Sequence, residues 1–239
     1  MAHNLSENLG DDAISWHSEI AQQFNDKYQN KQNFIDRYAL LTTLIEKYSD
    51  AHSLVFDLGC GSGNLALFAS DRNCQTIGFD ASHDMLKIAR QKMAARTTLE
   101  FIHADFYDIA KQISQQADLI ICSSVIEYLD DIELAFSQLR NLVKDNGTII
   151  FTLPNIASIY RKLERMAYRL FGIPKYYRYV INTPTQSAIL DLLARHQFQV
   201  LETHYFALPP LLNRFNQPLA NMRAINNLTV FVAKAQSKR

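Results

Sequence analysis

The sequence predicts an α/β fold in which a mainly parallel sheet is covered by helices on both faces. Short apolar runs alternate with helical patterns along most of the chain, and this alternation is typical of βαβ units. The 239 residues are enough for one large domain, and the 48% that are hydrophobic can form a sizeable core. The first strands are expected over residues 54–58, 76–79, 99–103, 118–122 and 147–153.

Helical periodicity predicts the elements around these strands. Apolar residues recur every three or four positions over 13–48, before the first strand. The later helices are expected from about residue 64 and over 82–95, 132–143 and 183–195. The last of these would have Thr183 as its N-cap and Pro184 at its first position. Two late strands, 198–205 and 228–233, have no helix between them and should pair antiparallel.

Composition excludes several classes of protein. Lys and Arg number 24, as do Asp and Glu, so no overall basic field favours a nucleic-acid partner. The three cysteines (Cys60, Cys74 and Cys122) are widely spaced, which disfavours a disulfide framework or a zinc site. The first twelve residues lack the apolar core of a secretory signal, and no apolar run approaches the roughly 20 residues of a membrane span. A cytoplasmic protein is expected.

A glycine-rich loop after the first predicted strand is the most informative segment. Residues 55–64 read VFDLGCGSGN, so an apolar strand runs into three alternating glycines and then into a helix. Glycines allow a sharp turn and close approach to a ligand, and a helix N-terminus offers free N–H groups. The third glycine comes one residue earlier than in the dinucleotide pattern G-x-G-x-x-G, which disfavours an NAD-dependent oxidoreductase.

Three acids that follow the predicted strands suit a nucleoside-like ligand with a positive charge. Asp57 would repel a pyrophosphate but attract a cationic ammonium group. Asp80 lies 23 positions later, close to the separation expected of an acid that binds ribose hydroxyls. Asp105 can accept a hydrogen bond from an adenine amino group, with Phe106 against the ring. Any one of these acids could simply cap a loop, so the inference rests on the three together.

These segments resemble the motifs of class I methyltransferases that use S-adenosylmethionine (SAM). VFDLGCGSG resembles their first motif, and GFD, HADF, DLIICSSVIEYLDD and LVKDNGTIIFTLPN resemble the later motifs in order. The resemblance implies a Rossmann-like sheet of seven strands, order 3-2-1-4-5-7-6, with the last strand antiparallel. It also implies that SAM binds at the carboxyl ends of the strands and leaves as S-adenosylhomocysteine (SAH). The residues expected to contact the cofactor are Tyr28, Asp57, Gly59, Cys60, Gly61, Asp80, Ala81, Met85, Ala104, Asp105, Phe106 and Ser123.

The resemblance also divides the chain into regions. Residues 1–50 are expected to form a helical lid that folds over SAM and excludes water from the transfer step. Residues 51–239 are expected to form the SAM-binding core, with an inserted cap helix over 155–182. Within the lid, Tyr28 is the candidate for contact with the methionine end of SAM.

The segment after the fourth predicted strand favours a small acceptor molecule over a nucleic acid. Methyltransferases acting on bases often carry an Asn/Asp-Pro-Pro-aromatic tetrad there, whereas this chain reads CSSVIEY over 122–128. The segment resembles that of small-molecule enzymes such as the ubiquinone-pathway O-methyltransferases. Some of those bind a divalent metal at positions that match Ser124, Glu127 and Tyr128. Two of the three ligand types are missing here, so no metal is expected.

Two residues are candidates for a direct role in catalysis. His17 could act as a base toward a hydroxyl acceptor and Tyr128 could orient the acceptor, although either side chain could instead pack in the lid or core. The predicted reaction is methyl transfer from SAM to an oxygen, or a nitrogen, of a small or lipid-like acceptor. The alternative is a non-catalytic module that binds SAM or SAH and acts as a partner or regulator.

The predicted insertion leaves two interpretations open. An apolar stripe over 156–171 stands beside six basic residues and a single acid, Glu164. A stripe of this kind usually contacts the protein core, which favours a cap helix over the pocket with solvated Arg and Lys. A basic amphipathic helix can also make peripheral contact with an anionic membrane or attract an anionic acceptor.

Overall fold

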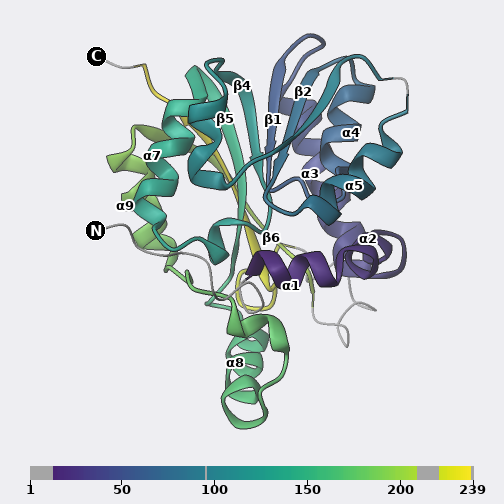
Figure 1. The fold of residues 1–239 in the computed structure, drawn as a ribbon. Coiled ribbons are helices and arrows are strands. Elements are labelled where there is room, and N and C mark those ends of the chain that lie inside the picture. The colour runs from purple at the N-terminus through teal and green to yellow at the C-terminus, as the bar shows by residue number, and fades with distance from the viewer. Residues whose placement is uncertain (1–12, 95, 209–220, 238–239) are drawn as a thin grey trace, which may run out of the picture.

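A seven-stranded sheet lies at the centre of the computed structural model, which describes residues 13–94, 96–208 and 221–237 (Figure 1). The order is β3-β2-β1-β4-β5-β7-β6, and β7 is antiparallel to both of its neighbours while the other pairs are parallel. The predicted fold class and strand order are therefore confirmed. The strands are β1 (Leu54–Leu58), β2 (Gln75–Asp80), β3 (Leu99–His103), β4 (Ala117–Cys122), β5 (Val143–Pro154), β6 (Phe198–Phe206) and β7 (Leu228–Ala235).

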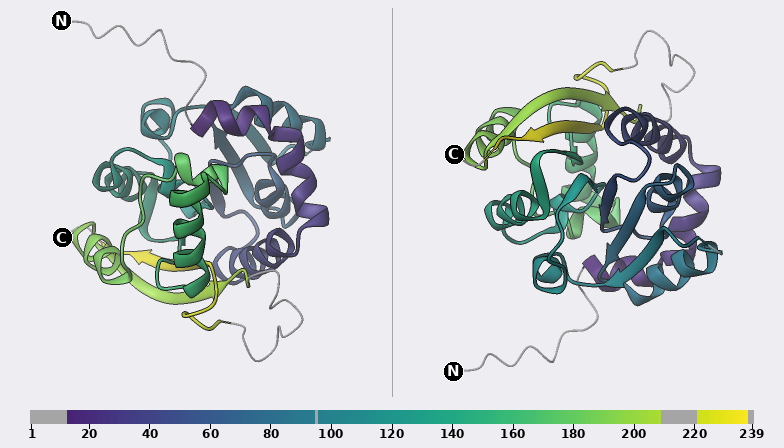
Figure 2. Two further views of the ribbon diagram at one scale, coloured as in Figure 1. Left: turned by 90° about the horizontal axis from the view of Figure 1, so that it is seen from below. Right: turned by 90° about the horizontal axis from the view of Figure 1, so that it is seen from above.

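Helices cover both faces of the sheet (Figures 1 and 2). One face packs against α3, α4 and α5, and the other against α6, α7 and α9. The helices are α1 (Ala13–Glu19), α2 (Ala21–Asn30), α3 (Gln32–Tyr48), α4 (Asn64–Asp71), α5 (His83–Lys92), α6 (Ile109–Gln112), α7 (Ile132–Leu142), α8 (Ile159–Phe171) and α9 (Gln186–Arg195). Short 3₁₀ turns are η1 (Phe106–Asp108), η2 (Ile126–Tyr128) and η3 (Lys175–Arg178).

Burial on both faces explains why the central strands are continuous apolar runs. In β1, Phe56 and Leu58 point into the core beneath α7 and α9, while Val55 points into the core beneath α3 and α4. All three side chains are fully buried. Since alternate residues of a strand face opposite ways, a strand covered on both faces needs apolar residues at every position. The one charged residue of β1, Asp57, comes near its carboxyl end.

The main difference from the predicted elements is the start of α9. Thr185, rather than Thr183, is the N-cap, and its hydroxyl accepts a hydrogen bond from the backbone N–H of Ala188 at 3.2 Å. Pro184 therefore precedes the helix instead of opening it. Both threonines are suitable N-cap residues, and the observed capping bond is the one made by Thr185.

The N-terminal helices lie along the edge of the sheet where the parallel strands end (Figure 1). Ser18 of α1 is hydrogen-bonded to Ser82 at 2.7 Å, and Lys92 of α5 donates to Asn25 of α2. Helix α3 continues to the first strand. Residues 1–12 of the predicted lid lie outside the described residues. Among the helices that are described, none combines the length and the hydropathy needed to cross a membrane.

Candidate active site

A cavity of about 460 Å³ opens at the carboxyl ends of the parallel strands. This volume is typical of a small-molecule site, and the position is the one where open α/β sheets bind ligands. Every predicted site residue lines this cavity, although the role of each one remains a prediction. They are His17, Tyr28, Asp57, Gly59, Cys60, Gly61, Asp80, Ala81, Met85, Ala104, Asp105, Phe106, Ser123 and Tyr128.

The glycine loop closes tightly between β1 and α4. Gly63 caps α4 in the left-handed region, with φ +78°, and a Cβ at this position would lie 2.7 Å from the Phe101 ring. The loop is joined to β2 by a hydrogen bond from Gly61 N to Asp80 Oδ2 at 2.7 Å. Since glycine alone adopts this backbone at no steric cost, the loop can turn within the few residues between strand and helix.

Asp57 is a buried carboxyl group at the inner end of the cavity. Its Oδ2 accepts a hydrogen bond from Ala66 N at 3.1 Å, and the residue is only 2% exposed. Burial is the main cause that raises the pKa of Asp57 to about 7; the Ala66 N–H opposes this rise, and the nearby carboxylate of Asp80 adds to it. A positively charged ligand group beside this buried carboxyl would stabilise its ionised form and lower its pKa, so a cation is a favourable partner for Asp57.

SAM affinity is expected to rise with pH below neutrality. If the ammonium group of SAM pairs with Asp57, binding lowers the pKa of that carboxyl and releases a proton. Affinity should then increase about tenfold per pH unit up to pH 7 and level off above it. Calorimetry between pH 5.5 and 8.5, in buffers of different ionisation enthalpy, would measure the proton release directly.

The Asp57→Asn variant is the control for that experiment. It keeps the shape but cannot titrate, so any pH dependence that remains belongs to the ligand. Equal pH profiles for the wild type and Asp57→Asn would contradict the pairing of Asp57 with a cation.

Asp80, at the end of β2, is held in place by the backbone. Oδ2 accepts from Gly61 N, and Oδ1 accepts from Ser82 N at 2.8 Å. A carboxylate has about four acceptor positions, so two remain for the adjacent hydroxyls of a ribose. Burial raises the pKa of Asp80, while the two N–H groups oppose that shift. The fixed orientation fits the predicted ribose contact.

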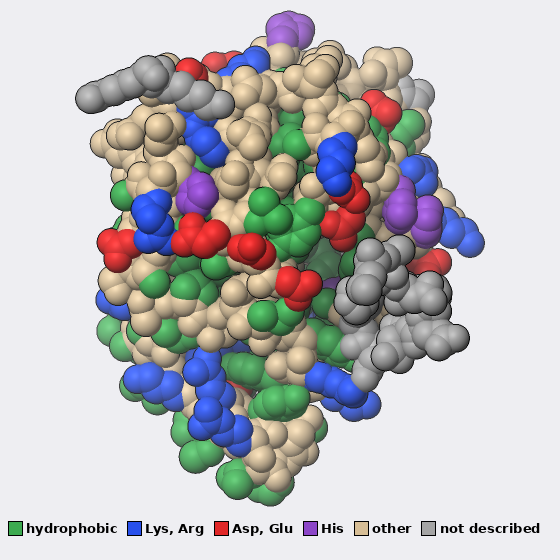
Figure 3. All heavy atoms as spheres, turned by 60° about the vertical axis from the view of Figure 1, so that its left-hand side comes forward, with side chains coloured by type: hydrophobic (Ala, Val, Ile, Leu, Met, Phe, Trp, Pro, Cys, Tyr) green, Lys and Arg blue, Asp and Glu red, His purple; other side chains and the backbone are tan. Residues whose placement is uncertain are grey.

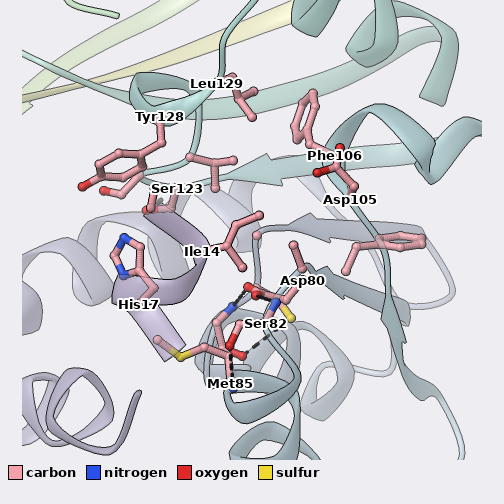
Figure 4. A pocket seen from close by; sticks show the side chains of 18 of the residues that line it. Ile14, His17, Asp80, Ser82, Met85, Asp105, Phe106, Ser123, Tyr128 and Leu129 are labelled. Carbon is pink, nitrogen blue, oxygen red and sulfur yellow. Dashed lines mark hydrogen bonds between the residues drawn. The ribbon is translucent and has the colours of Figure 1, made fainter. Parts of the chain in front are cut away.

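The opposite wall of the cavity carries the groups predicted to receive adenine. Asp105 and Phe106 lie together there, away from His17 and Tyr128 (Figure 4). One oxygen of Asp105 accepts from Tyr107 N at 3.0 Å and so caps η1. Ser123, which lines the cavity after β4, has a buried hydroxyl oxygen with no hydrogen-bond partner among the described residues. A buried unpaired hydroxyl is unusual and fits a polar ligand atom at this point.

The end of the cavity opposite the adenine wall is aromatic. His17 packs edge-on against Tyr128, with ring centroids 5.4 Å apart, and Trp16 stacks on Tyr179 at 5.4 Å. Burial and the nearby Lys27 lower the pKa of His17 to about 4, so its imidazole is neutral at physiological pH. Burial raises the pKa of Tyr128, which keeps its hydroxyl protonated. His17 and Tyr128 are therefore neutral polar groups within this aromatic wall.

A segment that follows α8 forms part of this wall, and it lies within the predicted cap of 155–182 although none of its residues was singled out from the sequence as a site residue. Arg178, Tyr179 and Ile181 line the cavity. The carbonyl of Glu127 accepts hydrogen bonds from Ile181 N at 2.8 Å and Asn182 N at 3.0 Å, which hold the segment against η2. Main-chain bonds of this kind leave no signature in a sequence. The chain between 155 and 177, including α8, contributes no residue to the cavity lining, which differs from the expectation of a helix over the pocket.

The described residues contain no group of three or more His, Cys, Asp or Glu side chains that could hold a metal ion. Glu127, which matches a metal-ligand position in the enzymes that the segment resembles, is buried and does not line the cavity. Burial raises its pKa to about 7, against the effect of the nearby Arg37 and Arg161.

Comparison with known proteins places this site in a family. Residues 28–203 match the model of a methyltransferase domain. The chain is 29% identical over 102 residues to the ubiquinone biosynthesis O-methyltransferase of Vibrio atlanticus, covering 42% of this chain and 43% of that protein. It is 25% identical over 157 residues to the malonyl-[acyl-carrier protein] O-methyltransferase of Enterobacter lignolyticus, covering 63% and 58%. The chain thus spans about half the length of the curated relatives it matches.

A solved structure shares the fold across nearly the whole chain. The magnesium protoporphyrin IX methyltransferase from Synechocystis PCC 6803, solved with bound SAH, superposes with a TM-score of 0.72 at 15% identity, covering 94% of this chain and 98% of that one. The glycine loop, the oriented Asp80, the desolvated Asp57 and the unpaired Ser123 hydroxyl all fit SAM, and SAM is the cofactor of this family. The chain belongs to the methyltransferase domain family of SAM-dependent enzymes.

Proposed function

We propose that this protein transfers the methyl group of SAM to an acidic oxygen, a phenolate or a carboxylate, of an apolar or lipid-like acceptor. The observation that carries the proposal is the composition of the acceptor end of the cavity. Apolar and aromatic side chains wall it, and its polar groups include the neutral His17 and the protonated Tyr128. The charged side chains of Asp130 and Arg178 also line the cavity. The apolar wall is formed by Ile14, Tyr128, Leu129, Tyr179 and Ile181.

The protonation states favour an oxygen that is already acidic. SAM supplies an activated methyl group, so the chain has to position the acceptor, exclude water and accommodate its proton. With a pKa of about 4, His17 is a weak proton acceptor and would remove a proton from an alkyl alcohol poorly. It can accept a hydrogen bond from a phenol, while the Tyr128 hydroxyl can donate one to a phenolate or carboxylate oxygen. Arg178 adds a positive side chain to the cavity lining.

Two relatives support an oxygen acceptor. The proteins from Vibrio atlanticus and Enterobacter lignolyticus are both named as O-methyltransferases, one of ubiquinone biosynthesis and one of malonyl-[acyl-carrier protein]. Both names give oxygen as the methylated atom, which supports an oxygen acceptor for this chain.

The proposal is tested by SAH formation with a panel of acceptors. Hydrophobic phenols, aryl or alkyl carboxylates, matched alcohols and matched amines would be supplied in detergent at pH 7.5. Turnover is expected with phenols or carboxylates and should be much slower with alcohols. Turnover with amines alone would contradict the oxygen assignment. Tight SAH binding with no turnover of any acceptor would favour a non-catalytic module instead.

Tyr128→Phe is expected to lower kcat/KM by about tenfold or more, because it removes a hydrogen bond to a charged oxygen. SAH affinity should stay unchanged, since the cofactor end of the cavity is untouched. The matched control is Tyr205→Phe. Tyr205 lies on β6, outside the cavity, and its hydroxyl donates a hydrogen bond to Gln186 Oε1 at 3.0 Å. If both variants keep full activity, Tyr128 only packs.

A further inference from the structure

Helix α8 is amphipathic, and its apolar face points away from the protein instead of toward the core. Ile159, Leu163, Met166 and Leu170 recur at helical spacing along one face, and Phe171 follows them. These five side chains are between 53% and 73% exposed, and no residue of the helix is buried. A surface helix ordinarily turns such a stripe toward the core. The helix projects below the sheet and forms the tip of the molecule (Figures 1 and 3).

The opposite, polar face of α8 is the one bound to the rest of the protein. The guanidinium of Arg161 donates to Asn227 O at 3.0 Å and to the Tyr176 hydroxyl, and it pairs with Glu164 at 3.2 Å. Tyr168 stacks on Tyr177 of η3, with centroids 5.7 Å apart. These specific contacts fix the rotation of the helix. The outward position of the apolar stripe is therefore a property of the fold and not of a loosely attached segment.

Positive charge surrounds the apolar tip. Residues 155–182 hold six of the chain's 24 Lys and Arg but only one of its 24 Asp and Glu. Lys162 and Arg169 are exposed on α8 itself, and Lys175 is exposed on η3. Figure 3 shows Lys and Arg side chains grouped just above the hydrophobic tip. An apolar strip beneath a belt of basic side chains matches the boundary between acyl chains and anionic headgroups of a bilayer.

We propose that the exposed face of α8 docks on the surface of an anionic lipid bilayer. Ile159, Leu163, Met166, Leu170 and Phe171 enter the acyl boundary, and Lys162, Arg169 and Lys175 meet the headgroups. The basic side chains beside the stripe favour a bilayer over a second copy of the chain, because two copies that met through this surface would bring like charges together.

The docking surface is joined directly to the cavity. The chain passes from η3 into Tyr179 and Ile181, which line the acceptor end, and Ile181 is itself 55% exposed. An acceptor dissolved in the bilayer would meet the cavity beside the docked helix. This route rests on the proposed function, whereas membrane docking does not.

Vesicle flotation with the full chain, without any acceptor, tests the docking. The wild type is expected to float with mixed phosphatidylcholine–phosphatidylglycerol vesicles and to bind phosphatidylcholine vesicles much more weakly. Replacing Leu163, Leu170 and Phe171 together with serine should weaken binding by at least about tenfold. The double variant Lys162→Glu/Arg169→Glu should lose the preference for anionic vesicles, and added salt should do the same to the wild type.

Two control variants change the same kinds of side chain elsewhere on the surface, so they show whether the effect depends on the position in α8. Leu134→Ser/Leu190→Ser removes apolar side chains that are 42% and 40% exposed on α7 and α9. Lys87→Glu/Lys111→Glu reverses two exposed charges on α5 and α6. Both control variants should float like the wild type, and all variants should bind SAH normally, which shows that they fold.

Three results would overturn the docking proposal. One is no flotation with anionic vesicles. Another is an equal loss of binding in the variants and their controls. The third is sedimentation showing a wild-type dimer that the triple serine variant converts to monomer, because the stripe would then bind a second copy. A chain that floats but methylates none of the acceptors would leave docking intact and count against the proposed function alone.

Discussion

Gly59→Ala is expected to weaken SAM binding by a hundredfold or more, about 2.7 kcal/mol. Gly59 opens the loop after β1 with φ +68°, which costs a residue with a Cβ about 1–2 kcal/mol. The added Cβ would also collide with the Val125 side chain, which lines the cavity after β4. The loop must move to relieve this collision, and the hydrogen bond from Gly61 N to Asp80 moves with it. Calorimetry with SAM and SAH measures the loss.

Gly172→Ala is a matched control for the backbone cost alone. Gly172 has the same φ of +68°, but nothing lies within 4 Å of the position its Cβ would take. This variant should lose a similar increment of stability from the left-handed backbone and keep its SAM affinity. Equal SAM affinity for Gly59→Ala and Gly172→Ala would show that the loop does not approach the cofactor closely.

Asp80→Ala is expected to cost about 1–3 kcal/mol of SAM affinity, roughly a 5- to 150-fold weaker Kd. The carboxylate is aimed by Gly61 N and Ser82 N, and its loss removes two charge-assisted hydrogen bonds to the ribose. The same factor should be lost for adenosine, which lacks the methionine half. By contrast, Asp57→Asn should weaken SAM much more than adenosine.

Asp84→Ala is the control for that comparison, because Asp84 is exposed in the first turn of α5 and does not line the cavity. It should bind SAM as the wild type does. Unchanged SAM affinity in Asp80→Ala would remove the ribose assignment, and an equal loss in Asp84→Ala would point to damage of α5 instead.

The fold, and the meeting of the predicted cofactor-binding residues in one cavity, were predictable because their determinants are local. A parallel strand that ends in an acid places that acid at one edge of the sheet, so Asp57, Asp80 and Asp105 had to meet once the strands were recognised. Ser82 shows the same on a smaller scale, since its hydroxyl caps α5 by accepting from Met85 N at 3.2 Å. Sequence patterns predict such short-range contacts well.

The remainder depends on contacts between distant residues. Periodicity identified the apolar stripe of α8 but not the direction it faces, which is set by Arg161 bound to Asn227 and Tyr176. The acceptor wall needs Tyr179 to meet Trp16, 163 positions away in the chain, and main-chain hydrogen bonds to Glu127 hold that segment. Neither relation has a local pattern, so the helix itself was expected over the pocket, and residues 178–181 were not singled out as site residues within the predicted cap.

A crystal structure of the protein with SAH tests the central claim most directly. The account predicts the ribose hydroxyls on Asp80, the adenine between Asp105 and Phe106, the amino group toward Asp57, and the sulfur facing His17 and Tyr128. SAH bound elsewhere, or bound with its ribose away from Asp80 in the same cavity, would contradict it.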